Sequence, residues 1–131
     1  MKIFNAIFWL PRNIRGAAVL RLLYGCDIPK EANIDNSVEF PHHALGVVIA
    51  PNVIIEKNVV IQHHVTLGMN RQGKSPVIRE GAYVGAGAIV LGNVEIGRNA
   101  TIGAGTIVTK TVPANGVYIN PVELFDVGKA D

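Results

Sequence analysis

The stretch "PVIREGAYVGAGAIVLGNVEIGRNATIGAGTIV" (residues 76–108) carries an aliphatic residue at every sixth position. The members of this aliphatic column are Ile78, Val84, Val90, Ile96, Ile102 and Val108. The same spacing occurs upstream at Ile49, Ile55, Ile61 and Leu67, and Ile34 starts the series. Four residues after each member except Leu67 comes a second small or β-branched residue. An internal repeat of this kind predicts a solenoid of short parallel strands.

A third column consists of Asn and Gly, three residues after most members of the first. Its residues are Asn52, Asn58, Asn70, Gly81, Gly87, Asn93, Asn99 and Gly105. Both residue types tolerate a positive φ, so this column predicts a recurring corner. Three such repeats would make one triangular coil, with the aliphatic column pointing inward. The unbroken register over residues 78–108 favours this all-β solenoid over an ordinary β-sandwich.

The six-residue register breaks twice, and inserted loops on a rigid scaffold commonly carry function. Three extra residues fall around "FPHHALG" (residues 40–46), and five extra residues fall in "MNRQGKSP" (residues 69–76). The four histidines form two pairs, His42-His43 and His63-His64, whose spacing is that of one three-repeat coil plus the three-residue excess. This spacing would stack the pairs at one corner. His63 and His64 are then either simple corner residues, where positive φ favours His, or contacts to an acceptor.

The composition is that of a single domain with an aliphatic core: 131 residues, 49% apolar and 6% aromatic. The net charge is only +2 and the cations are scattered, so we expect no nucleic-acid partner. The lone Cys26 excludes an internal disulfide and fits a reducing compartment. No run approaches the roughly 20 apolar residues of a membrane span, and no cleavage motif follows the first apolar residues. We therefore expect a cytoplasmic protein.

Residues 1–26 precede the repeats and differ from them. The segment "PRNIRGAAVLRLLYG" (residues 11–25) begins with Pro and ends with Gly, which favours a helix. Its apolar face would cover the end of the solenoid or pack within an oligomer; alternatively, residues 1–25 lie on the inner face of a membrane. We expect this segment to be followed by a β-helix over residues 27–118 and a tail over residues 119–131.

Four stretches together resemble the hexapeptide-repeat acyltransferases, in the branch of serine acetyltransferases and bacterial polysaccharide O-acetyltransferases. They are "HALGVVI" (43–49), "VIQHHVTLG" (60–68), the repeat 76–108 and "TKTVPANGV" (109–117). The resemblance covers roughly residues 27–118. It implies a left-handed parallel β-helix, acetyl-CoA as co-substrate, no metal, and a homotrimer with active sites between subunits. Only the resemblance implies the left hand, because parallel crossovers are usually right-handed.

The resemblance also implies which histidine is the catalytic base. In the family it is the His of a His-x-x-Gly motif, which corresponds to His43 by its distance from Gly46. A neutral imidazole would take the proton of an acceptor hydroxyl as that oxygen attacks the thioester. The carboxylate that orients the base in the serine enzymes corresponds to Asp27. Counting forward from Ile34 instead puts the base at His42, so the sequence leaves these two neighbours open.

The family's cofactor site corresponds to small residues along the repeat. The pantetheine arm of CoA would lie along Gly85, Ala86, Gly103 and Ala104, residues that also build corners in any such solenoid. Thr109 and Lys110 would lie near the nucleotide, where Lys110 can meet a phosphate. The second inserted loop carries Arg71 and Lys74, which either close over a neighbouring subunit's acceptor or cofactor or project into solvent.

Several positions depart from the serine acetyltransferase pattern, and most concern the acceptor. The serine enzymes have Asp before the motif His, and Arg-His before the Pro of the "IREG" strand; this chain has His42, Lys74 and Ser75 there. Their preceding helical domain corresponds here to about 25 residues. We therefore expect a sugar hydroxyl of a surface polysaccharide or other glycan as acceptor, contacted by His42, His63 and His64, with serine O-acetylation as the alternative. Ile119 to Val122 replaces a family Gly-Asn-Pro-Ala near the adenine end.

A zinc protein of the γ-carbonic-anhydrase type is the alternative from another class. Those proteins share the solenoid and hold zinc through three histidines, two of them four residues apart. That spacing is absent here, and the histidine motif is typical of acyl transfer. We therefore prefer the acetyltransferase over a zinc protein and over a non-catalytic scaffold.

Overall fold

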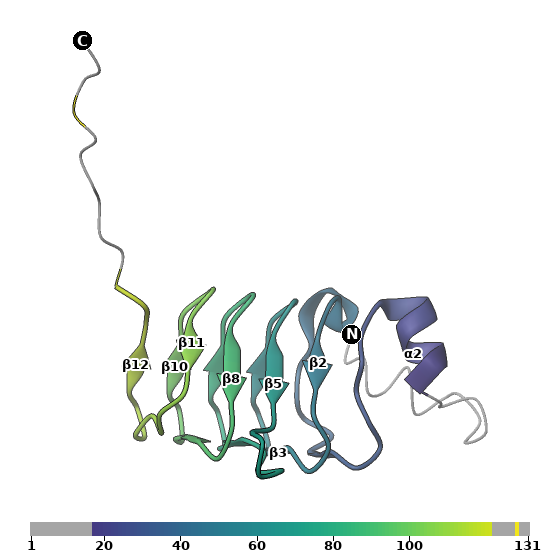
Figure 1. Ribbon diagram of the computed structural model, residues 1–131, viewed down its shortest axis with the longest axis horizontal. Coiled ribbons are helices and arrows are strands. Elements are labelled where there is room, and N and C mark those ends of the chain that lie inside the picture. The colour runs from purple at the N-terminus through teal and green to yellow at the C-terminus, as the bar shows by residue number, and fades with distance from the viewer. Residues whose placement is uncertain (1–16, 122–127, 129–131) are drawn as a thin grey trace.

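Twelve short parallel strands stack into a β-helix in the computed structural model, which describes residues 17–121 and 128 (Figure 1). The strands are β1 (Asn33–Ile34), β2 (Val48–Ile49), β3 (Ile54–Ile55), β4 (Val60–Ile61), β5 (Thr66–Gly68), β6 (Val77–Ile78), β7 (Tyr83–Val84), β8 (Ile89–Leu91), β9 (Glu95–Ile96), β10 (Thr101–Ile102), β11 (Ile107–Val108) and β12 (Val117–Tyr118). They form three four-stranded sheets, in the orders β11-β8-β5-β2, β12-β10-β7-β4 and β1-β3-β6-β9. The predicted all-β solenoid is confirmed.

The strand register confirms both the three-repeat coil and its two interruptions. Val48 pairs with Thr66, three repeats later, whereas Asn33 pairs with Ile54 across the three-residue insertion. Thr66 pairs with Ile89 across the five-residue insertion. The last coil is shorter, because Thr101 pairs with Val117, which comes two positions before three full repeats are complete. The repeat therefore contracts slightly where it ends.

Most of the core comes from the two predicted inward columns. Their members are buried throughout, apart from the partly buried Ile34 at the first coil. Burying one such aliphatic side chain contributes about 1.5–3 kcal/mol, so stacked columns stabilise every coil against its neighbours. Phe40 is the single aromatic side chain in the described core, and it comes directly before the first histidine loop.

Most of the Asn and Gly column has the predicted positive φ. This holds at Asn52, Asn58, Gly81, Gly87, Asn99 and Gly105. The prediction is wrong at Asn70 and Asn93, where Gly73 and Gly92 adopt the positive φ instead. Asn70 has another use: its Oδ1 accepts hydrogen bonds from the backbone N–H groups of Gln72 and Lys74, which organises the inserted loop.

The helix α2 (Ala17–Tyr24) lies at the end of the β-helix that carries β2 (Figure 1). It ends where predicted, at Gly25, whose φ is +63° and whose N–H donates to the Arg21 carbonyl. Leu20 joins the buried cluster that contains Cys26, and burial raises the pKa of the Cys26 thiol. The predicted start of this helix at Pro11 lies outside the described residues. In residues 17–121, no helix is long and apolar enough to cross a bilayer.

Ion pairs link the coils along the corner between the sheet of β3 and the sheet of β4. The Arg79 guanidinium bridges Glu56 (2.8 Å) and Glu95 (2.7 Å), and Glu80 pairs with Lys57 and Arg98. Hydrogen bonds from Arg79 lower the pKa of both Glu56 and Glu95. We call these charged residues the Arg79 ladder. Its acidic and basic groups pair with one another, so we assign it a structural role.

Candidate active site

Both histidine pairs lie at one corner of the prism, on adjacent coils. His42 and His43 belong to the short turn η1 (Pro41–Ala44), and His63 and His64 follow β4. The His64 N–H donates to the Leu45 carbonyl at 2.8 Å, which joins the two coils. The ring centroids of His42 and His63 are 4.9 Å apart, and those of His63 and His64 are 5.6 Å apart. The predicted stacking of the pairs is therefore confirmed.

The first histidine pair sits on a left-handed turn. His42, His43 and Ala44 have φ values of 56°, 56° and 54° in succession. For residues with a Cβ this conformation costs about 1–2 kcal/mol each. Burial of Ala44 and a hydrogen bond from the Gly46 N–H to the Gly25 carbonyl hold the turn in place. The three extra residues thus form a strained turn that exposes His42 and His43, a feature that clusters at functional sites.

The glycine of the His-x-x-Gly motif has a specific neighbour. Gly46 has φ +68°, and a Cβ there would overlap Nδ1 of His64 and lie 2.5 Å from its Cε1. The His64 ring therefore occupies the space that a side chain at position 46 would need. Glycine at the end of the motif lets the second histidine pair pack against the first turn.

His43 faces an aromatic ring that sequence reasoning missed. The rings of Tyr24 and His43 are 5.9 Å apart and tilted by 33°. Tyr24 is the last residue of α2, so the helix contributes to the surroundings of His43. The Pro and Gly at the two ends of residues 11–25 predicted this helix. The six-residue repeat does not indicate that the helix lies against the histidine turn.

Asp27, which the resemblance paired with His43, has a different partner in this chain. Its Oδ2 accepts a hydrogen bond from Nη2 of Arg21, and this ion pair raises the pKa of the Arg21 guanidinium. Its backbone pairs with Val48 beside the histidine turn. In the part of the chain that the structure describes, no hydrogen bond joins Asp27 to His43.

The ring of His63 has an unsatisfied nitrogen in the middle of the cluster. Its Nδ1 is buried and has no hydrogen-bond partner among the described residues. Leaving a buried polar atom unpaired costs about 1–3 kcal/mol. Such an atom between His42 and His64 is typical of a functional site or of a hydrogen bond completed from outside the chain.

Small residues continue the histidine corner into the next coils. The Gly87 N–H donates to the His63 carbonyl, and the Gly105 N–H donates to the Ala86 carbonyl. Ala86 and Ala104 present only methyl groups at this corner, and a Cβ on Gly105 would meet nothing within 4 Å. The predicted cofactor residues Ala86 and Ala104 therefore lie on the same corner as the histidines, in the next two coils, and we call this row of small residues the shelf.

Glycine is required at position 85 for a structural reason that is separate from any ligand. A Cβ on Gly85 would lie 2.6 Å from the backbone nitrogen of Ala104 in the next coil. Close stacking of the coils requires glycine at this position with or without a ligand. The exposed methyl group of Ala104 is thus the better place to probe ligand binding.

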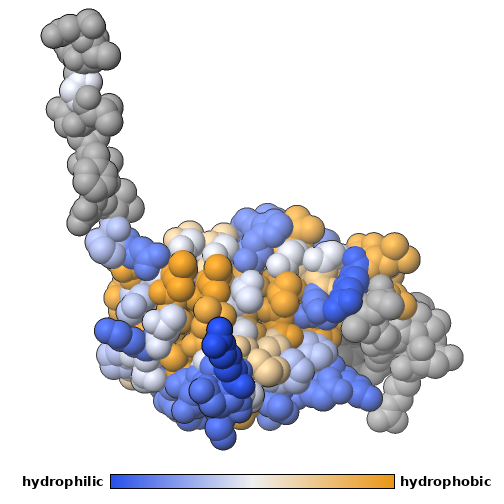
Figure 2. Space-filling view, in the orientation of Figure 1, coloured by the Kyte–Doolittle hydropathy of each residue, from blue (hydrophilic) through white to orange (hydrophobic). Residues whose placement is uncertain are grey.

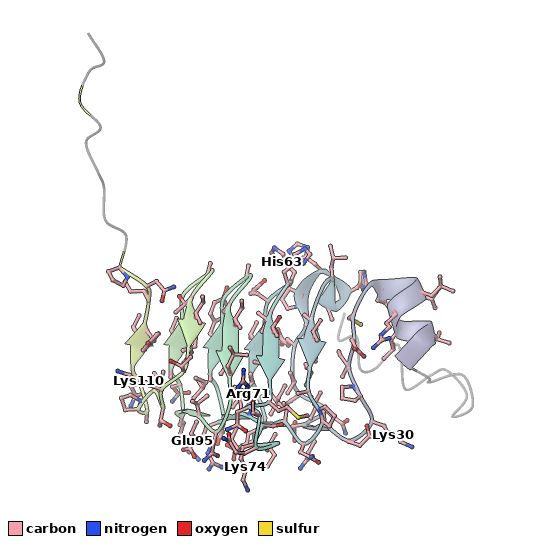
Figure 3. All side chains as sticks on the ribbon, in the orientation of Figure 1. Lys30, His63, Arg71, Lys74, Glu95 and Lys110 are labelled. Atoms are coloured by element: carbon pink, nitrogen blue, oxygen red, sulfur yellow. The ribbon has the colours of Figure 1, made fainter. Side chains whose placement is uncertain are left out.

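The remaining predicted residues lie away from the histidine corner. Figure 3 shows His63 at one edge of the prism and Arg71 and Lys74 at the opposite edge. Thr109 and Lys110 follow β11 and are exposed, so a strand separates them from the shelf. A single chain does not bring these four residues to the histidines.

No three His, Cys, Asp or Glu side chains are grouped to hold a metal ion in residues 17–121. The three histidine rings instead meet edge to face, with interplanar angles of 81° and 72°. His63 thus contacts His42 and His64 through its ring.

Comparison with known proteins identifies the repeat and its relatives. Residues 75–110 match the family model "Bacterial transferase hexapeptide (six repeats)". The serine acetyltransferase of Escherichia coli K12 is 46% identical over 110 residues, covering 80% of this chain and 39% of that protein. A putative serine acetyltransferase of Schizosaccharomyces pombe is 46% identical over 95 residues, covering 70% of this chain and 35% of that protein.

A solved structure agrees with these relatives. The serine acetyltransferase of Brucella abortus strain S19 in complex with coenzyme A has a TM-score of 0.77 and 30% identity, over 92% of this chain and 51% of the other. The chain thus spans between a third and about half of the length of the proteins that it matches. The residues matched by the family model include Ala86 and Ala104 and begin after the histidine pairs.

Proposed function

This chain belongs to the hexapeptide-repeat acyltransferase family and has its left-handed β-helix, and from that premise we propose that it is a CoA-dependent O-acetyltransferase with His43 as general base. One observation carries the proposal: the exposed His43 lies on a strained turn at the corner that continues into the small-residue shelf. A base beside an edge that small residues leave open suits transfer from a thioester to a hydroxyl. The similarity to a serine acetyltransferase solved with coenzyme A supports the same chemistry.

In the proposed mechanism His43 accepts the proton of the acceptor hydroxyl. The oxygen then attacks the acetyl carbonyl of the thioester, and the C–S bond breaks as the thiolate of CoA leaves. The imidazolium of His43 supplies the proton that the thiolate takes up, which balances the reaction without an acyl-enzyme. His42 is the alternative base, because it shares the turn and the exposure of His43.

The CoA co-substrate would lie along the shelf. Ala86 and Ala104 would border the pantetheine arm, because their methyl groups leave the edge free for a narrow chain. Lys110 would meet a phosphate as a point charge. Since β11 separates Lys110 from the shelf, the nucleotide end would have to turn across this strand to reach it.

L-Serine is the acceptor that the comparisons favour over the glycan expected from the sequence, because the relatives at 46% identity are serine acetyltransferases. A sugar hydroxyl in polysaccharide or glycan biosynthesis is the second candidate. It is favoured by one observation: imidazoles of His42, His63 and His64 line the corner. Imidazole nitrogens can donate and accept hydrogen bonds, as the recognition of a polyhydroxyl compound requires.

We also propose a homotrimer with active sites between subunits. Within one chain Arg71 and Lys74 lie on the edge opposite His63 (Figure 3). A neighbouring copy would bring its inserted loop to the histidine corner and add two cations to the acceptor or cofactor site. Light scattering of the purified chain tests the assembly.

The proposed activity is tested by following release of the CoA thiol from acetyl-CoA. The purified chain is offered L-serine, nucleotide sugars and surface-glycan fragments in parallel. Release that depends on L-serine supports the first acceptor, and release that depends on a sugar supports the second. An enzyme that binds neither CoA nor acetyl-CoA would contradict the proposal.

A further inference from the structure

The C-terminal end of α2 contacts the histidine turn through backbone and side chains. The Gly46 N–H donates to the Gly25 carbonyl at 3.0 Å. A Cβ on Gly25 would lie 3.5 Å from Cδ1 of Leu45, so the backbone at the helix end is close to this side chain. The ring centroids of Tyr24 and His43 are 5.9 Å apart, within the range of about 4.5–7 Å that favourable aromatic pairs adopt. The end of the helix therefore packs directly against the turn that carries His43.

The β-helix holds this end of α2 in a defined place. Leu20 and Cys26, on either side of Tyr24 in the sequence, are 6% and 1% exposed and belong to the buried core. The Asp27 N–H donates to the Val47 carbonyl at 2.8 Å, which joins the residues after the helix to the next coil. Tyr24 is partly buried and packs against the same core. The position of its ring is therefore set by the fold.

The imidazole of His43 has few other restraints. The left-handed φ of 56° fixes its backbone, but the side chain is exposed. Within residues 17–121, this imidazole makes no hydrogen bond, and its aromatic contact is the ring of Tyr24. An exposed side chain can change between staggered rotamers. A ring packed against one side of the imidazole limits this exchange, so Tyr24 is the group that can select an orientation.

We propose that Tyr24 is a positioning residue, whose ring fixes the orientation in which the His43 imidazole meets the acceptor hydroxyl. This inference rests on the proposed role of His43 as general base. A base acts only within hydrogen-bond reach of the proton that it takes, and a small misplacement of reacting groups lowers the rate by a large factor. The aromatic ring supplies the restraint, because the Tyr24 hydroxyl makes no hydrogen bond within the described part of the chain.

The helix itself offers a matched control for substitutions of Tyr24. Figure 2 shows apolar side chains exposed over α2, and Leu22 is 85% exposed. Leu22→Ala therefore removes a large apolar side chain from the same helix and leaves the contact between Tyr24 and His43 in place. Tyr24→Leu removes the ring but keeps a large apolar side chain with a high helix propensity. Tyr24→Phe removes only the hydroxyl.

Kinetics of these variants test the proposal, with the acceptor that supports thiol release from acetyl-CoA in the screen above. We expect Tyr24→Leu to lower kcat about tenfold or more, because the imidazole loses its fixed orientation. KM for acetyl-CoA should stay unchanged, because Tyr24 lies outside the shelf. Tyr24→Phe and Leu22→Ala should keep most of the turnover. Thermal unfolding verifies that all variants are folded.

NMR of the histidine Cε1–H groups tests the contact independently of any activity. The His43 signal is the one that disappears in His43→Asn. The current of the Tyr24 ring shifts this signal, so it should move in Tyr24→Leu and stay close to its wild-type position in Tyr24→Phe and Leu22→Ala.

The two measurements separate failure of this inference from failure of the proposed function. An unmoved His43 signal or an unchanged kcat in Tyr24→Leu would overturn the positioning role. So would an equal loss of kcat in Leu22→Ala, which would indicate a general effect of the helix, or in Tyr24→Phe, which would assign the effect to the hydroxyl. A wild-type protein that releases no thiol with any acceptor would refute the proposed function, and the NMR signal alone would then decide whether Tyr24 orients His43.

Discussion

The ring of His63 packs edge-on against the ring of His42, with the centroids 4.9 Å apart and the planes at 81°. The two residues belong to successive coils, and His42 lies on the turn formed by the three-residue insertion. This contact ties the strained histidine turn to the regular repeat beneath it. The orientation of His42 and His43 therefore depends on residues of the next coil as well as on their own turn.

Gly46→Ala should disrupt this corner. The new Cβ would overlap Nδ1 of His64, so the imidazole must move, and the φ of +68° adds strain. We expect a loss of about 2–4 kcal/mol in the free energy of unfolding and lower turnover. Urea unfolding measures the first, with Gly73→Ala as control, since Gly73 has φ +76° and open space around it. Equal losses in both variants would show that His64 does not fill the space at Gly46.

His63→Phe should raise stability slightly. Phenylalanine keeps a ring between His42 and His64 and removes the buried, unpartnered Nδ1. The expected gain is about 1 kcal/mol in the free energy of unfolding, whereas His63→Ala should lose stability by leaving a cavity. Thermal and urea unfolding of both variants provide the measurement. A loss of equal size in the two variants would mean that the nitrogen has a partner in solution.

Ala104→Leu should impair binding of the co-substrate without affecting the fold. Ala104 is exposed on the proposed shelf, so a larger side chain blocks the shelf but displaces no core residue. We expect KM for acetyl-CoA to rise about tenfold or more, with an unchanged unfolding midpoint. Ala114→Leu, at an exposed corner on another edge, is the control. An unchanged KM in Ala104→Leu would place CoA elsewhere.

The Arg79 ladder should make stability depend on acidic pH. Arg79 lowers the pKa of Glu56 and Glu95 in the folded state, so their contribution is complete above the unfolded value of about 4.3 and is lost as pH falls through the folded value. Glu56→Gln and Glu95→Gln should each destabilise the protein at pH 7 by less than about 1 kcal/mol, because these pairs are solvent-screened.

The difference between each of these variants and the parent should shrink as pH falls below 4, which unfolding midpoints at several pH values measure. The exposed Glu39→Gln is the control, since Glu39 lies outside the ladder. A difference that stays constant from pH 7 to pH 3 would exclude the ladder as the source of the pH dependence.

The sequence predicted those parts of the molecule that obey the local repeat. The six-residue spacing identified the inward columns, most corners and both insertions, because each coil must bury the same positions on its neighbours. It also predicted the stacking of the histidine pairs, because the two pairs are separated by one coil plus the three extra residues. The corner prediction was wrong at Asn70 because a side-chain hydrogen-bond network replaced the backbone turn there.

The surroundings of His43 could not be predicted from the repeat. Tyr24 and Arg21 belong to a helix outside the repeat, and its packing on the first coil determines their contacts. The proximity of Gly46 and His64 likewise depends on the path of the left-handed turn, because three extra residues can be accommodated in several ways. These are tertiary contacts without a sequence period.

The identity of the base is tested most directly by His43→Asn and His42→Asn, because Asn tolerates the φ of 56° that both positions require. Thiol release from acetyl-CoA is measured with L-serine and with nucleotide sugars, alongside CoA binding. We predict that His43→Asn lowers kcat about 10²- to 10⁴-fold while CoA binding is retained, and that His42→Asn keeps most of the turnover. If kcat of His43→Asn equals that of the wild type, or if kcat falls only in His42→Asn, the assignment of His43 as the base is contradicted.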